Sequence, residues 1–247
     1  MNRTKRLALI NLIVLLALII WNYVSNSGVV GGETVGTISR KYDNLFTPAS
    51  YAFAIWGFIY LSLLFQAIYY IAAAFKTSQD IDYILKSAPW LIISNLGNAL
   101  WLWCWLHEYL GVSVILMIFL FFSLLIAVVR LNMERWNAPV MYIATVWWPI
   151  DVYVGWISIA LIANVTVYLK YIGFNGAFLS EEVWTLVVII FATFIHFWMV
   201  WQRNMREFAA VGIWAFVAIG VRHWTLLPLI VWTAFICSAI KSGEVPA

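Results

Sequence analysis

Apolar residues form eight long runs along the chain, and short polar segments separate them. A helix needs about 20 mostly apolar residues to cross a membrane, and most of these runs approach that length. The pattern therefore predicts an all-α integral membrane protein with about eight transmembrane helices. The predicted spans cover residues 7–24, 51–75, 89–106, 109–130, 140–169, 183–201, 208–221 and 225–240.

The last two predicted spans are short, and only Arg222 and His223 separate them. This spacing leaves open whether they form a tight helical hairpin or one interrupted element. The first span follows a positive segment, as a signal peptide would. Its apolar run of about 18 residues exceeds the usual 7 to 15 of a signal peptide, so we expect a retained anchor helix.

Lysine and arginine alternate between many and few in successive loops of this topology, as the positive-inside rule requires. The alternation predicts that both termini are cytoplasmic, and we expect a bacterial inner membrane. One side holds Arg3, Lys5, Arg6, Lys76, Lys86, Arg130, Arg135, Arg203, Arg206 and Lys241, while the other holds Arg40, Lys41, Lys170 and Arg222.

Composition supports the membrane class and narrows the chemistry. The chain is 65% hydrophobic and 10% charged, which excludes a soluble globular protein. Its net charge of +3 is scattered, so nucleic acid is not an expected partner. The two cysteines, Cys104 and Cys237, lie far apart in apolar runs and predict neither a disulfide nor a metal site. The 16 tryptophans exceed what interfacial belts require, which suggests that indoles are used inside the bundle.

Asp151 is the only acidic residue well inside a predicted span, and a charge there is costly to insert. Pro149 is expected to kink the same helix. Helical spacing puts Trp148, Asp151, Gly155 and Ser158 on one face, which we expect to point into the bundle. Asp151 is either a proton-titrating or ligand-anchoring carboxylate, or it caps free backbone near Pro149 or pairs with a lysine or arginine.

Two other features are candidates for a site. His196 lies near the middle of the sixth span and is either a packing residue or a haem ligand or proton relay. A stripe of polar and aromatic residues follows one face of the third span, where it either holds helices together or forms a pocket wall for a flat ligand. The stripe consists of Ser94, Asn98, Trp101 and Trp105.

The longest predicted loop runs from Ser25 to Ser50 and is either a connector or a cover over a pocket. The chain contains no glycine-rich phosphate loop, nucleophile elbow or recognisable Ser/His/Asp set. The sequence therefore does not require an enzyme.

Three stretches together resemble the tryptophan-rich sensory protein family, also called the translocator protein or peripheral benzodiazepine receptor family (TspO/MBR). Residues 48–60 read PASYAFAIWGFIY and contain the family's W-x-x-x-Y as Trp56 and Tyr60. Asn98 and Trp101 match L-N-x-x-W, with Gly97 in place of the leucine. Residues 153–164 are similar to Y-x-x-W-x-S-x-A-x-x-x-N.

This resemblance covers about residues 7–170 and implies a five-helix unit that is commonly dimeric. It implies a pocket for porphyrins and other flat hydrophobic ligands beneath the loop between the first two helices. Residues 171–247 would then be additional transmembrane helices packed on that unit. These helices are where a second copy of the chain or a partner membrane protein is expected to bind. The ligand-binding residues implied are Trp56, Tyr60, Asn98, Trp101, Tyr153, Trp156 and Asn164.

The resulting functional hypothesis is a membrane-embedded binding or sensing protein for tetrapyrroles or similar planar molecules. Its ligands would be such a molecule, bound porphyrin or haem, and membrane lipid, with no metal site. Light-dependent porphyrin degradation is implied only as a secondary activity. The alternatives are a proton-coupled exporter of a small hydrophobic solute that uses Asp151, and an accessory membrane subunit.

Overall fold

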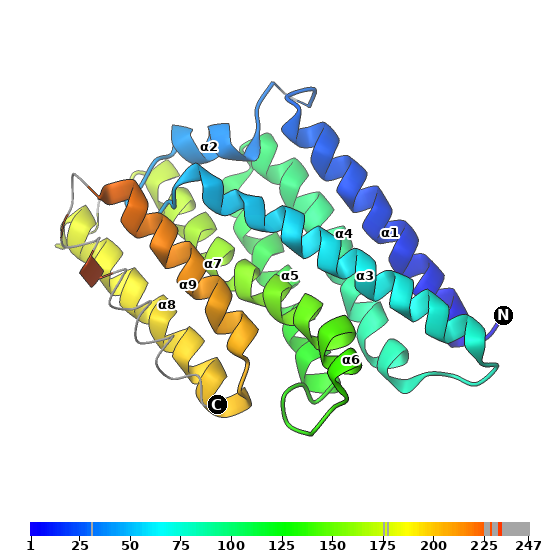
Figure 1. The fold of residues 1–247 in the computed structure, drawn as a ribbon. Coiled ribbons are helices and arrows are strands. Elements are labelled where there is room, and N and C mark those ends of the chain that lie inside the picture. The colour runs from blue at the N-terminus through cyan, green and yellow to red at the C-terminus, as the bar shows by residue number, and fades with distance from the viewer. Residues whose placement is uncertain (31, 175, 177, 225–227, 229–231, 234–247) are drawn as a thin grey trace.

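The computed structural model is an all-α bundle, and the part of the chain that it describes contains no strand (Figure 1). The structure describes residues 1–247 except 31, 175, 177, 225–227, 229–231 and 234–247. The long helices are α1 (Arg3–Asn26), α3 (Ile55–Lys76), α4 (Asp82–Leu106), α5 (Leu110–Arg130), α7 (Trp148–Tyr171), α8 (Glu181–Arg203) and α9 (Arg206–His223). The short elements are α2 (Val35–Lys41), the 3₁₀ turn η1 (Ser50–Ala54), α6 (Val140–Tyr142) and the π-helical turn η2 (Ile143–Trp147).

Seven of the eight predicted spans correspond to these long helices, which confirms the all-α membrane class. The eighth, 225–240, lies almost entirely outside the described residues, as do Cys237 and the hairpin expected there. Within the described residues, five segments are long and apolar enough to cross a membrane by length and composition. They are Arg3–Asn26, Ser50–Lys76, Leu110–Arg130, Val140–Tyr171 and Glu181–Arg203.

Helices α4 and α9 are not among these five apolar segments, and both pack between other helices. Helix α4 packs between α1 and α5 and carries the buried stripe Ser94, Asn98, Trp101 and Trp105. Helix α9 packs against α7 and α8 and includes Arg206, Glu207 and Arg222 at its ends. Buried helices in a membrane can carry polar residues on the faces that meet protein.

The two ends of the bundle are distinct, and we name them the α2 end and the α6 end (Figure 1). The N-terminus belongs to the α6 end. There the Asn2 side chain caps α1 by accepting from the Lys5 amide at 3.0 Å, and Thr4 Oγ1 donates to Asp80 Oδ1 at 2.8 Å. These contacts join the start of α1 to the loop between α3 and α4.

The kink expected at Pro149 stays a prediction, and the structure has a π-helical turn, η2, that ends two residues before this proline. Proline has no amide hydrogen to donate, and π turns are one way in which a helix accommodates that loss. Gln66 of α3 donates from Nε2 to the Val146 carbonyl inside this turn at 2.9 Å. Helix α7 thus starts from a fixed but irregular turn.

The face of α7 predicted to point inward needs one correction. Asp151, Gly155 and Ser158 are buried, but Trp148 is 43% exposed. Trp148 is the first residue of α7. Helical spacing gives the angle of a side chain around the helix axis but not whether a neighbouring helix covers it, and Trp148 is left exposed at the start of α7.

Candidate functional site

An aromatic cavity of about 1230 Å³ lies at the α2 end, bordered by α1, α2, η1, α3 and α4. We call it the aromatic cavity because Phe53, Trp56, Tyr60 and Trp101 line it. A smaller inner pocket of about 50 Å³ shares several of these walls and adds Trp105, Trp156 and Asn164. Five of the seven predicted ligand-binding residues line one or both: Trp56, Tyr60, Trp101, Trp156 and Asn164.

The aromatic rings that line these spaces contact one another. Trp56 stacks on Tyr60 with ring centroids 5.4 Å apart. Trp156 meets the edges of Trp56 at 6.4 Å and Phe53 at 6.2 Å. Offset and edge-to-face packing of this kind orients rings without filling the space between them.

Asn164 connects three helices behind the inner pocket. Its Oδ1 accepts from Trp101 Nε1 at 2.7 Å, and its Nδ2 donates to Ser113 Oγ at 2.8 Å. These bonds join α4, α7 and α5. Because Asn164 is buried and has no access to water, these two bonds satisfy its polar atoms.

The two remaining predicted residues, Asn98 and Tyr153, line neither of these cavities. Asn98 Nδ2 donates to Tyr153 OH at 3.0 Å, and both side chains are fully buried. The Tyr153 ring packs against Trp56 with centroids 6.1 Å apart. This pair supports the aromatic wall from behind.

The loop between α1 and α3 forms the outer wall of the aromatic cavity. Within it, α2 begins at a capping box between Thr34 and Thr37. Ser39, Arg40, Asp43 and the residues from Thr47 to Ser50 line the cavity. The sequence left open whether this loop connects or covers, and in the structure its residues line the aromatic cavity.

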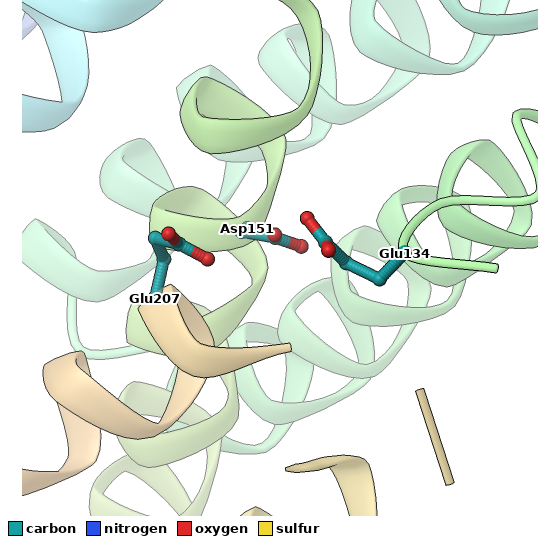
Figure 2. A group of neighbouring side chains, drawn as sticks. All are labelled: Glu134, Asp151 and Glu207. Atoms are coloured by element: carbon teal, nitrogen blue, oxygen red, sulfur yellow. The ribbon is translucent and has the colours of Figure 1, made fainter. Parts of the chain in front are cut away.

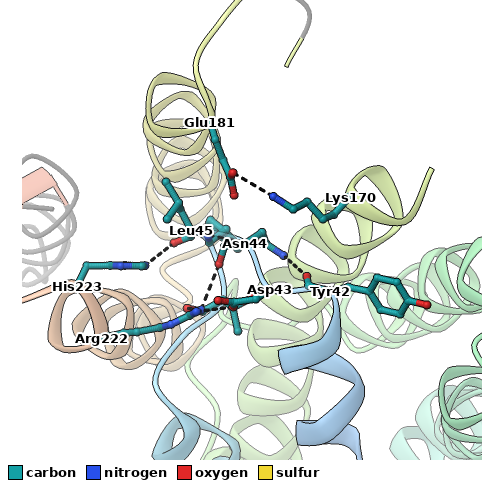
Figure 3. Close-up of polar contacts among 10 residues, drawn as sticks. Tyr42, Asp43, Asn44, Leu45, Lys170, Glu181, Arg222 and His223 are labelled. Carbon is teal, nitrogen blue, oxygen red and sulfur yellow. Dashed lines mark hydrogen bonds and ion pairs between the residues drawn. The ribbon is translucent and has the colours of Figure 1, made fainter. Parts of the chain in front are cut away.

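Helix α9 holds the other side of this loop (Figure 3). Arg222 donates from Nη1 to the carbonyls of Asn44 at 3.1 Å and Thr47 at 2.7 Å, and it pairs with Asp43. His223 Nε2 lies 2.9 Å from the Leu45 carbonyl oxygen. From the sequence, Arg222 was predicted only as a loop charge, because nothing local links it to residues about 175 positions away.

Further along α9, two bonds reach the 3₁₀ turn. Trp214 Nε1 donates to the Ala52 carbonyl at 3.1 Å, and the Ala49 amide donates to the Ala218 carbonyl at 3.1 Å. Helix α9 thus helps to build the cavity wall. The division of the chain at residue 170 stays a prediction.

A latch on the opposite side ties α2 to the loop between α4 and α5. Lys41 Nζ pairs with Glu108 Oε1 at 2.5 Å, and Tyr42 OH donates to the other carboxylate oxygen. The hydrogen bond from Lys41 and then that from Tyr42 lower the pKa of Glu108.

We expect Glu108→Gln to lower the thermal midpoint slightly at pH 6, by about 1 to 2 °C for a partly exposed ion pair. A lowered carboxyl pKa gives stability that is present above the unfolded pKa and is lost as pH falls through the folded value. The difference between parent and variant should therefore begin to shrink below about pH 4.3, the ordinary pKa of glutamate, and close below the lowered pKa of folded Glu108. Melting curves from about pH 2.5 to 7 measure this, and a difference that does not shrink as pH falls would exclude the latch as its source.

Asp151 and His196 lie outside the cavities. His196 is buried on α8, 3.0 Å from Ser158 Oγ, with its ring 4.4 Å from that of Phe208. The haem-ligand and proton-relay roles of His196 stay predictions. Asp151 is fully buried at the α6 end, and no ion pair joins it to a described lysine or arginine.

Glu134 and Glu207 come close to Asp151, and sequence spacing did not reveal this group (Figure 2). Glu134 lies in the loop after α5, and Glu207 lies in the first turn of α9. Burial first, and then the nearby Glu207, raise the pKa of Glu134 to about 7. Three acidic side chains thus lie close together at this point of the α6 end.

The apolar helices define an integral membrane protein whose bundle holds an aromatic cavity at one end. The chain belongs to the TSPO-like protein family, whose model matches residues 8–243. The match covers both the predicted five-helix unit and most of the additional helices. No curated protein and no solved structure matches the chain. Family membership indicates a membrane ligand-binding or transport protein.

Proposed function

We propose that the chain binds a planar hydrophobic molecule of the tetrapyrrole type in the aromatic cavity, as a binding or sensing protein. The observation that carries this proposal is that the aromatic cavity and the inner pocket share Phe53, Trp56 and Trp101 as walls. Aromatic walls suit a flat conjugated ligand, because indole and phenyl rings stack on it with a large apolar contact.

The size of the cavity fits a large ligand. Small-molecule pockets are typically about 300 to 1,000 Å³, and this cavity of about 1230 Å³ exceeds that range. Its outer rim is polar and includes Asn22, Asn26 and Arg40. A macrocycle with acidic edge groups could place its apolar plane inside and its charged groups near Arg40.

Trp156 adds a reason to expect a polar atom on the ligand. Its Nε1 is buried and has no hydrogen-bond acceptor among the described residues. An indole N–H left without an acceptor in an apolar environment is unfavourable. A ligand nitrogen or oxygen that reaches the inner pocket would satisfy it.

Protoporphyrin titration of the purified protein tests the proposal. We expect saturable quenching of tryptophan fluorescence at about one ligand per chain. Each of three variants should raise the dissociation constant by about 2- to 10-fold, as expected when an aromatic contact of about 0.5–1.5 kcal/mol is reduced. These variants are Trp56→Phe, Trp101→Phe and Trp156→Phe. Ligand absorbance provides a second readout that does not depend on the number of tryptophans.

Trp201→Phe is the matched control, because Trp201 is an exposed residue of α8 that lines neither cavity. Its dissociation constant should equal that of the parent. Quenching that does not saturate and is the same in all four variants would mean that the porphyrin partitions into detergent, and the proposal would be wrong.

A further inference from the structure

Three carboxylates from distant parts of the sequence meet at the α6 end, away from the aromatic cavity. They belong to Glu134, Asp151 and Glu207, and one oxygen of each lies within 4.8 Å of the others. Figure 2 shows the three side chains converging from the loop after α5, the first turn of α7 and the first turn of α9.

Asp151 is the central member of this group. Its side chain is completely buried, and neither of its carboxylate oxygens has a hydrogen-bond partner in the described chain. A buried carboxylate without hydrogen bonds or a counter-charge is among the most costly arrangements in a protein. The described residues therefore supply no partner for the Asp151 carboxylate.

Basic residues at this end do not fill that role. Arg135, Arg203 and Arg206 are all close in sequence to the three acids, but none forms an ion pair with them in the part of the chain that is described. Arg206 does act on Glu134 through space, yet its single charge cannot balance three carboxylates. A cation from solution would complete the balance.

We propose that Glu134, Asp151 and Glu207 form a binding site for a hard divalent cation of the size of Ca²⁺. All three ligands are carboxylate oxygens, which calcium and magnesium prefer. Calcium–oxygen distances are about 2.3 to 2.6 Å, so one calcium ion can contact three oxygens that all lie within 4.8 Å of one another. Magnesium is usually held by only one or two carboxylates and keeps several waters, so three converging carboxylates favour calcium.

The surroundings give an ion a route and room for bound water. A cavity of about 510 Å³ reaches Glu134 and is lined by Trp136, Trp147 and Asn204. Three protein ligands leave coordination positions free, and calcium commonly fills such positions with water. A bound ion would join the loop after α5, α7 and α9 at one point.

Terbium luminescence tests the site directly, since Tb³⁺ substitutes for Ca²⁺ and is excited by nearby indoles such as Trp136 and Trp147. Full-length protein in detergent, first stripped with EDTA, is titrated with Tb³⁺. We expect saturation at about one ion per chain, and displacement by Ca²⁺ at lower concentration than by Mg²⁺. Asp151→Asn, Glu134→Gln and Glu207→Gln should each weaken Tb³⁺ binding by about tenfold or more, because each removes a charged ligand.

Glu182→Gln is the matched control, because it removes a carboxylate at the opposite end of α8. Its Tb³⁺ affinity should equal that of the parent. In a second measurement, Ca²⁺ should raise the thermal midpoint of the parent and of Glu182→Gln above the value in EDTA, and Glu134→Gln should lose this increase. Glu134 lies in a loop, so this variant is expected to fold.

Binding of Tb³⁺ that does not saturate, or equal binding by the parent and the three cluster variants, would overturn the proposal. Displacement by Mg²⁺ at lower concentration than by Ca²⁺ would overturn the assigned ion size. None of these readouts depends on porphyrin. The proposed cation site can therefore be disproved without affecting the proposed porphyrin binding, and porphyrin binding can be disproved without affecting the cation site.

Discussion

Replacing Gly155 with leucine is expected to lower the stability of the protein by about 3 kcal/mol, the upper end of the cost of overpacking. Gly155 of α7 lies against Phe208 and Val211 of α9. A Cβ atom at this position would lie 3.1 Å from the Cα and carbonyl oxygen of Phe208 and 3.3 Å from Val211 Cβ. Because two of these atoms are backbone, α9 itself must move to make room.

Melting curves of the purified variant measure this effect. The thermal midpoint should fall by about 6 to 12 °C, at about 2 to 4 °C per kcal/mol for a chain of this size. Hydrogen exchange should rise in α9 more than in α5. Porphyrin affinity should also fall, because α9 holds the cavity loop through Trp214 and Arg222.

Gly57→Leu is the matched control for Gly155→Leu. A Cβ atom at Gly57 would have no neighbour within 4 Å, and Gly57 lines the aromatic cavity. This variant should keep or slightly raise the thermal midpoint, because glycine disfavours helix interiors. It should nevertheless weaken porphyrin binding by filling the cavity. Equal midpoints for the two variants would contradict the close packing of α7 on α9.

Most of the fold could be predicted from the sequence because membrane helices leave a strong local signal. Apolar runs of sufficient length located α1, α3, α5, α7 and α8 directly. Helical spacing also predicted correctly that Asn98 and Trp101 share one buried face of α4. It was wrong for Trp148, since spacing gives the angle around the helix axis but not whether a neighbouring helix covers the start of α7.

The candidate site was less accessible to sequence reasoning because its contacts join distant segments. Motif resemblance supplied Trp56, Trp156 and Asn164, which line the cavities. It could not show that Asn98 and Tyr153 bond to each other behind the wall.

The carboxylate cluster was hidden for the same reason. Asp151 was identified from its cost in a membrane, but Glu134 and Glu207 looked like ordinary residues of helix ends and loops. Only the packing of α9 on α7 brings Glu207 to Asp151. Single-sequence spacing contains no information about that approach.

Asn164→Leu is expected to destabilise the protein by about 2 kcal/mol and to weaken porphyrin binding. The substitution leaves Trp101 Nε1 and Ser113 Oγ without their interhelical partner. Interhelical hydrogen bonds in membrane proteins contribute about 0.6 kcal/mol on average and up to about 1.7, and two are lost here. The thermal midpoint should fall by about 4 to 8 °C.

A double-mutant cycle of Asn164→Leu with Trp101→Phe isolates the contact. If the bond between Trp101 and Asn164 is real, the double variant should be more stable than the sum of the two single effects by about 1 kcal/mol, because the bond can be lost only once. Ser123→Ala on α5 is the control, since within the described part of the chain Ser123 Oγ bonds only to carbonyls of its own helix, those of Phe119 and Leu120. Strict additivity in the cycle would show that Asn164 does not hold the Trp101 ring, and the inner pocket would then lack the anchor that fixes its wall.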